Sequence, residues 1–502
     1  MTLKTMTMKT MTITNALRGA FAVMMIVGAM TAGGCTSMTA GGTTGMAAEK
    51  ADSQPNILFI MVDDLGKEWI SSYGSETIET PNIDALAAGG MTFNNAYSMP
   101  SCTSSRTMLL TGKYPWRNGY VSHWDVPRWG VAYFDWKQKE NTTFARLMKD
   151  LGYATCAAGK WQINDFRIEP QAMKKHGFDD WAMWTGAETG VKASDHRYYN
   201  PYINTPEGTK TYAGKFGPDV YSDHIIKFMT KHKEQPMCIY YPMALVHRKW
   251  VASPDYPEAR SRLERHTSMV RYVDKMVGKL IKSLDELEIR DNTIVIFTTD
   301  NGTTGGHLGF TAVRNGIEVE GAKGELSEAG VCAPFIVNCP GTIPEGVETD
   351  ALTDFADLLP TFVELGGGTV PEDLIIDGTS IAPVILGENQ DSERPWIMSI
   401  GGGGGRITMD GVRGAKVFGA RVIRDKQHKV WVSEQKKITR LHDLKKDPWE
   451  TTNLLDSDLA EHKEALQKFQ AVVDTLPDQD AYPLYEPRAA NAWDKQLRVK
   501  KK

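Results

Sequence analysis

Residues 56–64 read Asn-Ile-Leu-Phe-Ile-Met-Val-Asp-Asp, and this stretch gives the clearest indication of the fold class. Its apolar run, residues 57–62, is unbroken, which is typical of a strand buried on both faces of a sheet. Similar runs recur at residues 155–158, 238–244, 293–298 and 334–337, and helical periodicity lies between them, at residues 82–88, 143–151, 219–232, 261–287 and 354–365. This alternation predicts an α/β fold over residues 55–390: a large, mostly parallel mixed sheet flanked by helices.

A different pattern begins at about residue 390. Residues 397–400, a run of five glycines, and short segments near residues 417–423 and 428–432 indicate a small antiparallel sheet. Residues 459–476 have the periodicity of one amphipathic helix. We therefore expect a smaller C-terminal subdomain of antiparallel sheet plus helix over residues 391–480, followed by a solvated tail, residues 481–502.

The N-terminus has the order of an export signal. Lys4, Lys9 and Arg18 precede an apolar stretch, residues 19–32, that is too short for a stable membrane span. Small residues then precede Cys35, as at a bacterial lipoprotein cleavage site. We expect a signal over residues 1–34, a flexible tether over residues 35–54, and export to the periplasm or to the cell envelope through acylated Cys35. Ordinary signal cleavage nearby, with Cys35 incidental, is the alternative.

Composition excludes several classes of protein. The chain has 502 residues, a formal charge of −5 and 41% hydrophobic residues, enough for a real core, which excludes global disorder. No apolar run reaches the roughly 20 residues of a membrane span, which excludes a polytopic membrane protein. The mild acidity gives no reason to expect nucleic acid as a partner. The six cysteines have no regular spacing, so we expect neither a disulfide framework nor a cysteine zinc site.

Acidic and amide side chains follow two of the predicted strands. Asp63 and Asp64 come directly after residues 57–62, and Asp300 and Asn301 come after residues 293–298. Ligand sites of parallel sheets collect at the carboxyl ends of the strands. Oxygen donors of this kind suit a hard cation, Ca²⁺ or Mg²⁺, and the spacing does not distinguish the two ions.

Between these strands, residues 101–113 read SCTSSRTMLLTGK. The segment resembles the signature of type I sulfatases, Cys-x-Pro-x-Arg followed by Leu-Leu-Thr-Gly and a basic residue. Further blocks resemble the family in the family's order over roughly residues 55–455. They are residues 56–66 (NILFIMVDDLG), 80–86 (TPNIDAL), 159–161 (GKW), His247, 299–302 (TDNG), 321–330 (GAKGELSEAG) and 442–454 (HDLKKDPWETTNL).

The resemblance implies the alkaline phosphatase-like fold and a specific chemistry. In the family the motif cysteine, here Cys102, is oxidised by a formylglycine-generating enzyme to Cα-formylglycine, whose hydrate supplies the nucleophile. By the same matching, Asp63, Asp64, Asp300 and Asn301, with the modified Cys102, would hold one Ca²⁺. The other matched positions are Arg106, which would neutralise the site, Lys113, Lys160 and Lys323, which would contact sulfate oxygens, and His247, which would be the general acid to the leaving alcohol.

This chain departs from the family pattern at two positions. Ser104 stands where Pro or Ala is usual, which bears on recognition by the maturing enzyme. Gln162 stands where a histidine usually follows GKW, and glutamine cannot titrate. His307 is a candidate substitute for that histidine, or else a substrate-binding or simple loop histidine.

The substrate is expected to be a carbohydrate. Tryptophans gather between residues 116 and 184, and indole faces stack on sugar rings, although most of these side chains are expected in the core. Trp124 and Trp129 are the best exposed candidates, with His123 and Arg128 as subsite contacts beside them. Gln162 and His307 complete the candidate substrate contacts.

The sequence therefore predicts an exported sulfatase that hydrolyses sulfate esters of a polysaccharide or oligosaccharide. Two alternatives stay open. One is a phosphoester or phosphonate hydrolase of the same superfamily. The other is a non-catalytic polysaccharide-binding protein, which the departures at Ser104 and Gln162 would suit.

Overall fold

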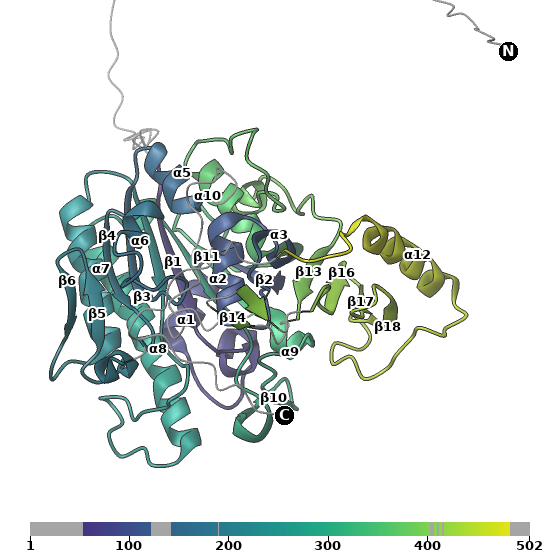
Figure 1. Cartoon of the computed structure of the whole chain (residues 1–502), viewed down its shortest axis with the longest axis horizontal. Coiled ribbons are helices and arrows are strands. Elements are labelled where there is room, and N and C mark those ends of the chain that lie inside the picture. Colours follow the sequence, from purple (N-terminus) through teal and green to yellow (C-terminus); the bar gives the residue numbers. More distant parts are fainter. Residues whose placement is uncertain are drawn as a thin grey trace, which may run out of the picture. The chain divides into compact units, whose positions relative to one another are not determined.

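A ten-stranded sheet forms the centre of the molecule (Figure 1). The structure is a computed structural model that describes residues 54–121, 142–188, 190–401, 406–408, 411–413 and 416–481. From edge to edge the strands are β12 (Val347–Asp354), β2 (Met91–Tyr97), β11 (Cys332–Asn338), β8 (Thr293–Thr299), β1 (Asn56–Val62), β7 (Met237–Pro242), β3 (Ala154–Lys160), β4 (Asp180–Trp184), β5 (Tyr202–Thr205) and β6 (Gly208–Thr211). The five apolar runs predicted as buried strands lie in this sheet, although the run at residues 238–244 continues two residues beyond β7.

The middle of the sheet is parallel and its margins are mixed. β1 pairs in parallel with β7 and β8, and β3 pairs in parallel with β7 and β4. β11 runs antiparallel between β8 and β2, and β5 and β6 extend the other side as an antiparallel ribbon. The predicted fold class, mostly parallel but mixed, is confirmed.

The side chains of strand β1 contribute to two hydrophobic cores, one on each face of the sheet. Ile57, Phe59 and Met61 point into one, where α2 (Cys102–Thr111), α5 (Phe144–Asp150) and α10 (Leu358–Leu365) pack. Leu58, Ile60 and Val62 point into the other, where α1 (Pro81–Ala88), α7 (Gly217–His232) and α8 (Arg262–Glu286) pack. Helices therefore cover both faces of the sheet (Figure 1), which is why the strand shows no polar alternation.

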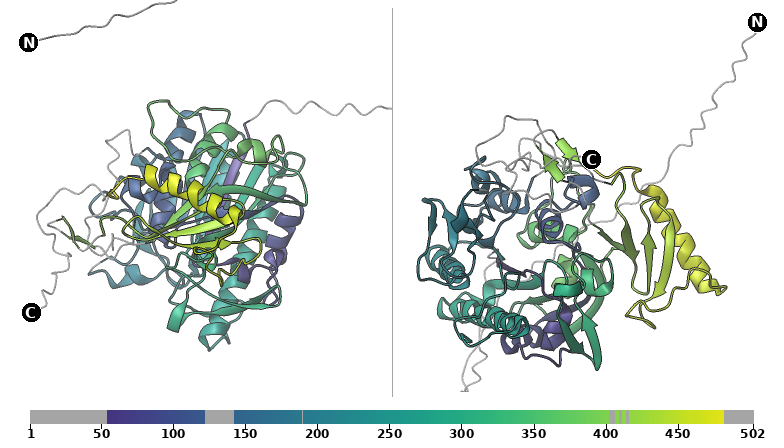
Figure 2. Two further views of the ribbon diagram at one scale, coloured as in Figure 1. Left: turned by 90° about the vertical axis from the view of Figure 1, so that its right-hand side faces the viewer. Right: turned by 60° about the horizontal axis from the view of Figure 1, so that its bottom comes forward.

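The C-terminal part is a second, antiparallel sheet with one helix, as expected. Its strands are β13 (Ile397–Ile400), β16 (Arg421–Arg424), β17 (His428–Val432) and β18 (Ile438–Asp443), and α12 (Ala460–Thr475) packs on one face (Figure 2). That face carries Met398, Ile423 and Val430 against Phe469 and Val473 of α12. The opposite face contributes Ile397 and Val422 to a small cluster with Tyr97 of the large sheet.

Short elements complete the described chain. They are α3 (Pro115–Asn118), α6 (Ala172–Lys175), α9 (Glu328–Val331), α11 (Ala382–Ile385), the hairpin β9 (Thr311–Arg314) and β10 (Ile317–Glu320), the pair β14 (Arg406–Thr408) and β15 (Gly411–Arg413), and 3-10 turns at Lys67–Trp69, Ser71–Tyr73, Lys192–Asp195, Arg290–Asn292, Gly306–Leu308 and Phe355–Asp357. Among the described residues, none of the helices is both long and apolar enough to cross a membrane. The expected signal, Cys35, all but the last residue of the tether, and residues 482–502 of the tail lie outside the described residues.

Gly159, near the end of β3, allows β3 and β7 to approach closely. Its φ is +130°, and a Cβ there would lie 2.0 Å from the carbonyl oxygen of Pro242. We expect Gly159→Ala to lower the free energy of unfolding by roughly 4 kcal/mol or more, because backbone clash adds to an unfavourable φ. Gly152→Ala is the matched control: its φ is +90° with no atom within 4 Å of the added Cβ, and it should cost only about 1–2 kcal/mol. Equal losses in urea unfolding would contradict this explanation.

Candidate active site

Two strand ends bring four oxygen-bearing side chains together. β1 and β8 run parallel and in register, with Val62 opposite Thr299, so Asp63 and Asp64 leave the sheet beside Asp300 and Asn301. The backbone amide of Asp300 donates to the Val62 carbonyl at 2.9 Å, and that of Asp64 donates to Asp300 Oδ1 at 3.2 Å. All four side chains are at most 2% exposed. The carboxyl ends of β1 and β8 thus bring together the four oxygen-bearing side chains that the sequence analysis singled out.

Arg106 neutralises part of this charge. Helix α2 begins at Cys102, so Arg106 lies one turn on, on the side that meets the strand ends. Its guanidinium donates to Asp300 Oδ2 at 2.7 Å and to the Lys160 carbonyl at 2.7 Å, and it is 3.4 Å from Asp63 Oδ2. Arg106 is fully buried, which makes this a buried ion pair and not a surface contact.

Two lysines balance the other carboxylates. Lys160, the last residue of β3, is fully buried and donates from Nζ to Asp63. Lys323, in the loop after β10, donates from Nζ to Asp64. Lys113 follows the C-terminus of α2 and is 3% exposed. Lys160 and Lys323 therefore contact the carboxylates of the site, Lys160 as a buried cation and Lys323 with a side chain that is 22% exposed.

Burial and charge set the protonation of the carboxylates. Burial alone raises the pKa of Asp63, but Lys160, His247 and Arg106 together hold it well below its usual range. Burial, followed by the Asp63 charge, raises the pKa of Asp300 to about 6. Burial also raises the pKa of Asp64, against the opposing effect of Lys323. Three buried carboxylates thus face three cations, Arg106, Lys160 and Lys323, and the pKa of two of the carboxyls is still raised. A bound cation would favour their charged form.

The donor set fits a hard cation. Asp63 Oδ1 and Asn301 Oδ1 are both buried and have no hydrogen-bond partner among the described residues. Unsatisfied buried oxygens are costly, and a Ca²⁺ or Mg²⁺ ion would satisfy them. One oxygen of Asp63, one of Asp300 and the Cys102 sulfur all lie within 4.8 Å of one another. The residues present therefore match an oxygen-ligated ion with the side chain of residue 102 beside it.

Cys102 lies at the N-terminus of α2 and is 4% exposed. Its sulfur is 3.6 Å from Gln162 Oε1. Gln162 has a left-handed backbone, with φ 59°, directly after the Gly-Lys-Trp block. Gln162 therefore lies beside residue 102, and its amide side chain cannot accept or donate a proton as a histidine would. Ser104 is buried, with its hydroxyl 3.1 Å from that of Ser101.

His247 lies across the site, with Nε2 3.9 Å from Asp64 Oδ2. Its Nδ1 is contacted by the Arg197 guanidinium at 2.9 Å and also by the carbonyl oxygen of Arg248. Burial, helped by Lys160 and Lys323, lowers the pKa of His247 well below its ordinary value.

Two contacts in the site were absent from the sequence prediction. Arg197 packs its guanidinium over the Trp184 ring at 4.6 Å while it reaches His247. Thr304 donates to Asp64 Oδ2 at 3.4 Å. Arg197 follows an ordinary polar loop, so no pattern distinguished it, whereas Thr304 stands two residues after the TDNG block and could have been included.

Other predicted contacts lie elsewhere. His307 is exposed on the Gly306–Leu308 turn, and its side chain makes no hydrogen bond or ion pair with any residue of the described segments. His123, Trp124, Arg128 and Trp129 fall outside the described residues. Trp161, Trp181 and Trp184 are buried, as the core interpretation of most tryptophans expected.

Comparisons with known proteins identify the family of this chain. Residues 55–368 match the family model described as Sulfatase. The chain is 32% identical over 367 residues to N-acetylgalactosamine-6-sulfatase of Canis lupus familiaris, which covers 69% of each protein. Ps i-CgsB in complex with k-i-k-neocarrahexaose superposes with a TM-score of 0.69, at 24% identity, over 86% of this chain and 95% of that one.

A further solved structure, in complex with its substrate D-glucosamine-2-N,6-O-disulfate, has a TM-score of 0.65 at 22% identity, over 85% of this chain and 99% of that one. At these identities the two solved structures show the fold alone. The family match covers more than half of the chain and includes both strand ends, Cys102 and Arg106. The chain therefore belongs to the sulfatase family, the type I sulfatases of the alkaline phosphatase-like superfamily, and is a sulfuric ester hydrolase.

Proposed function

We propose that this sulfatase hydrolyses sulfate esters of a carbohydrate, with formylglycine made from Cys102 as nucleophile and one Ca²⁺ held at the strand ends. The main observation behind the proposal is the position of the side chain of residue 102. Its side chain lies within 4.8 Å of carboxylate oxygens of Asp63 and Asp300, beside the two unpartnered oxygens of Asp63 and Asn301. A nucleophilic oxygen at that position would be in reach of a divalent ion.

Asp63, Asp64, Asp300 and Asn301 would hold the ion, which when bound supplies Lewis-acid polarisation of sulfate oxygens. Lys160 and Lys323 now donate to Asp63 and Asp64. With a cation held by those carboxylates, the two ammonium groups would be available to contact the sulfate oxygens and to stabilise the charge that develops on them. Arg106 stays bound to Asp300 and holds the carboxylates in place.

We assign to His247 the role of the general acid that protonates the leaving alcohol. Its Nε2 faces Asp64 across the site at 3.9 Å, so a proton on that atom would be positioned to reach the ester oxygen as the S–O bond breaks. Gln162, 3.6 Å from Cys102, would hydrogen-bond the modified side chain but cannot accept its proton. A histidine at position 162 would take that proton. We infer that His247 or a carboxylate of the site takes it here.

A carbohydrate substrate is supported by the similar proteins. The relative compared above is named for a sulfated amino sugar, and both compared structures hold carbohydrates. Export fits such a substrate, because polysaccharides lie outside the cell. We therefore propose a periplasmic or envelope-anchored enzyme, attached through acylated Cys35, and matured by a formylglycine-generating enzyme despite Ser104.

Release of inorganic sulfate and phosphate from matched esters tests the reaction. The purified native protein is offered sulfated glycosaminoglycans, sulfated algal glycans and the corresponding phosphate esters. Release of sulfate from a glycan supports the proposal, whereas a preference for phosphate would make the chain a phosphoester hydrolase. Mass spectrometry of the tryptic peptide ending at Arg106 tests the nucleophile. An unmodified thiol in an inactive protein from its native host would favour the polysaccharide-binding alternative.

Removal of the ion should stop the reaction. After dialysis against EGTA we expect sulfate release to fall to background, because Asp63 and Asn301 lose the partner of their free oxygens. Added Ca²⁺ should restore activity and, at 100 times its Kd, stabilise the fold by about 2.7 kcal/mol. Full activity in EGTA, with calcium verified absent by elemental analysis, would rule out the metal assignment.

A further inference from the structure

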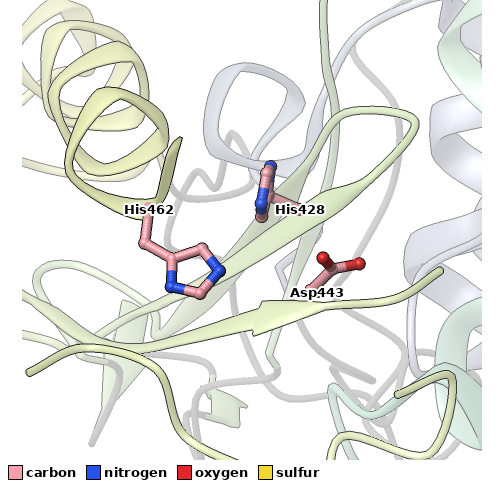
Figure 3. A group of neighbouring side chains, drawn as sticks. All are labelled: His428, Asp443 and His462. Carbon is pink, nitrogen blue, oxygen red and sulfur yellow. The ribbon is translucent and has the colours of Figure 1, made fainter. Parts of the chain in front are cut away.

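A second group of ligand-type side chains lies in the C-terminal subdomain, away from the strand ends. His428, Asp443 and His462 each offer one donor atom, and these atoms all lie within 4.8 Å of one another (Figure 3). The three side chains come from three elements: the start of β17, the end of β18 and the first turn of α12. All three residues are buried, at 7%, 1% and 4% exposure.

The fold brings them together for a simple reason. His428 and Asp443 are directly opposite each other in the β17–β18 pair, so their side chains share one face of the sheet. Val430 and Leu441 continue that face and pack with Phe469 of α12. The helix therefore lays His462 over the cross-strand pair.

Two ring nitrogens point to a missing partner. His428 Nε2 and His462 Nε2 are buried, and neither has a hydrogen-bond partner among the described residues. The other nitrogen of His462, Nδ1, is 2.7 Å from the Ser457 hydroxyl, an arrangement that orients a metal-binding ring. Two buried imidazoles beside the Asp443 carboxylate thus each have a nitrogen without a hydrogen bond, and a second carboxylate, that of Glu461, lies 3.5 Å from the nitrogen of His462.

We propose that His428, Asp443 and His462 bind a divalent transition-metal ion of the Zn²⁺ class, which fastens α12 to the small sheet. Two imidazoles and a carboxylate suit zinc, whereas the oxygen set at the strand ends suits calcium. Bonds of roughly 2.0–2.2 Å would draw the donor atoms closer than their present spacing, a movement that side-chain rotation supplies. The fourth position falls to water or to Glu461, whose Oε1 is 3.5 Å from His462 Nε2.

The Asp443 carboxylate is already in contact with Lys446 and Gln427. Lys446 Nζ lies 3.1 Å from Asp443 Oδ2 and 3.1 Å from Glu461 Oε1, so it bridges the two acids, and its side chain is 66% exposed. Gln427 donates to the same Asp443 oxygen at 3.0 Å. A bound cation would displace the Lys446 ammonium into water. Lys446→Ala should therefore tighten metal binding, which a purely structural lysine would not do.

The test is a Zn²⁺ titration of the full-length protein with excess Ca²⁺ present, so that the strand-end site is filled. We expect one Zn²⁺ equivalent that is lost, or weakened by more than roughly 100-fold, in His428→Gln and His462→Gln. His232→Gln, a change in the last turn of α7, is the matched control and should keep that equivalent. Equal zinc content in wild type and the double variant H428Q/H462Q would overturn the proposal.

Two further readouts separate the site from a folding defect and from thiol ligands. Without metal, wild type and the double variant should melt as folded proteins, and Zn²⁺ should raise the Tm of wild type alone. A Tm rise of equal size in both would contradict the assignment. Co²⁺ in place of Zn²⁺ should give tetrahedral visible bands without a thiolate charge-transfer band; a thiolate band would place the ion on cysteine and refute it.

Discussion

Cys102→Ala should abolish sulfate release and leave the fold intact. The side chain lies within the cluster of Asp63 and Asp300 oxygens, where the proposed chemistry puts the attacking oxygen. Loss of a nucleophile costs roughly 10⁴-fold or more in kcat. The change removes only a small polar group from the side chain, so the free energy of unfolding should fall by only about 1 kcal/mol. Steady-state sulfate release and urea unfolding on the same preparation measure both quantities.

Two outcomes would contradict this prediction. Retained activity in Cys102→Ala would refute the nucleophile, and a large loss of stability would make lost activity uninformative. Cys156→Ala is the matched control, since Cys156 is a fully buried thiol in β3. It should lose a similar amount of stability and keep its turnover.

Arg106→Ala should be among the most destabilising single changes. Arg106 is fully buried and contacts Asp300 at 2.7 Å and Asp63 at 3.4 Å. Removal of one partner from a buried ion pair costs about 3–5 kcal/mol, because it leaves uncompensated charge in the interior. Unfolding by urea in EGTA measures the effect without a cation that could replace the guanidinium charge. Activity with Ca²⁺ present should also fall, since Asp63 and Asp300 lose their orientation.

Arg440→Ala is the control for this prediction. Arg440 is exposed and its guanidinium lies 5.0 Å from the centre of the Trp431 ring, a contact worth about 0.5–1 kcal/mol. If Arg106→Ala is no more destabilising than Arg440→Ala, the buried network does not hold the strand ends together.

Much of the fold could be predicted because its central strands are buried on both faces. β1, β3, β7, β8 and β11 have continuous apolar runs, and α8 has a clear start, where Ser261 and Glu264 form a capping box. β2 and β12 were not predicted. β2 carries two asparagines, and β12 alternates acidic and apolar residues at the sheet edge, so neither has the pattern of a buried strand.

The site was predictable where chemistry is tied to strand ends and to the family motif. Asp63, Asp64, Asp300 and Asn301 follow the β1 and β8 runs directly, and Arg106 follows Cys102 by one helical turn. Arg197 could not be found this way, because its role depends on a loop that folds back over Trp184 and His247. The His428, Asp443 and His462 group was missed because its members follow no ligand spacing in the sequence and meet only through strand pairing and helix packing.

The enclosure of Cys102, only 4% exposed at the first turn of α2, has a consequence for biosynthesis. A catalyst that oxidises the thiol must reach it, and in the folded chain Cys102 is almost fully enclosed. Under the proposed chemistry, oxidation and folding therefore compete kinetically for each newly made polypeptide. Chains that fold before oxidation would keep a buried, unmodified thiol and would be inactive. A preparation expressed faster than the oxidising enzyme can act would therefore be well folded and give a single melting transition, but its specific activity would be low.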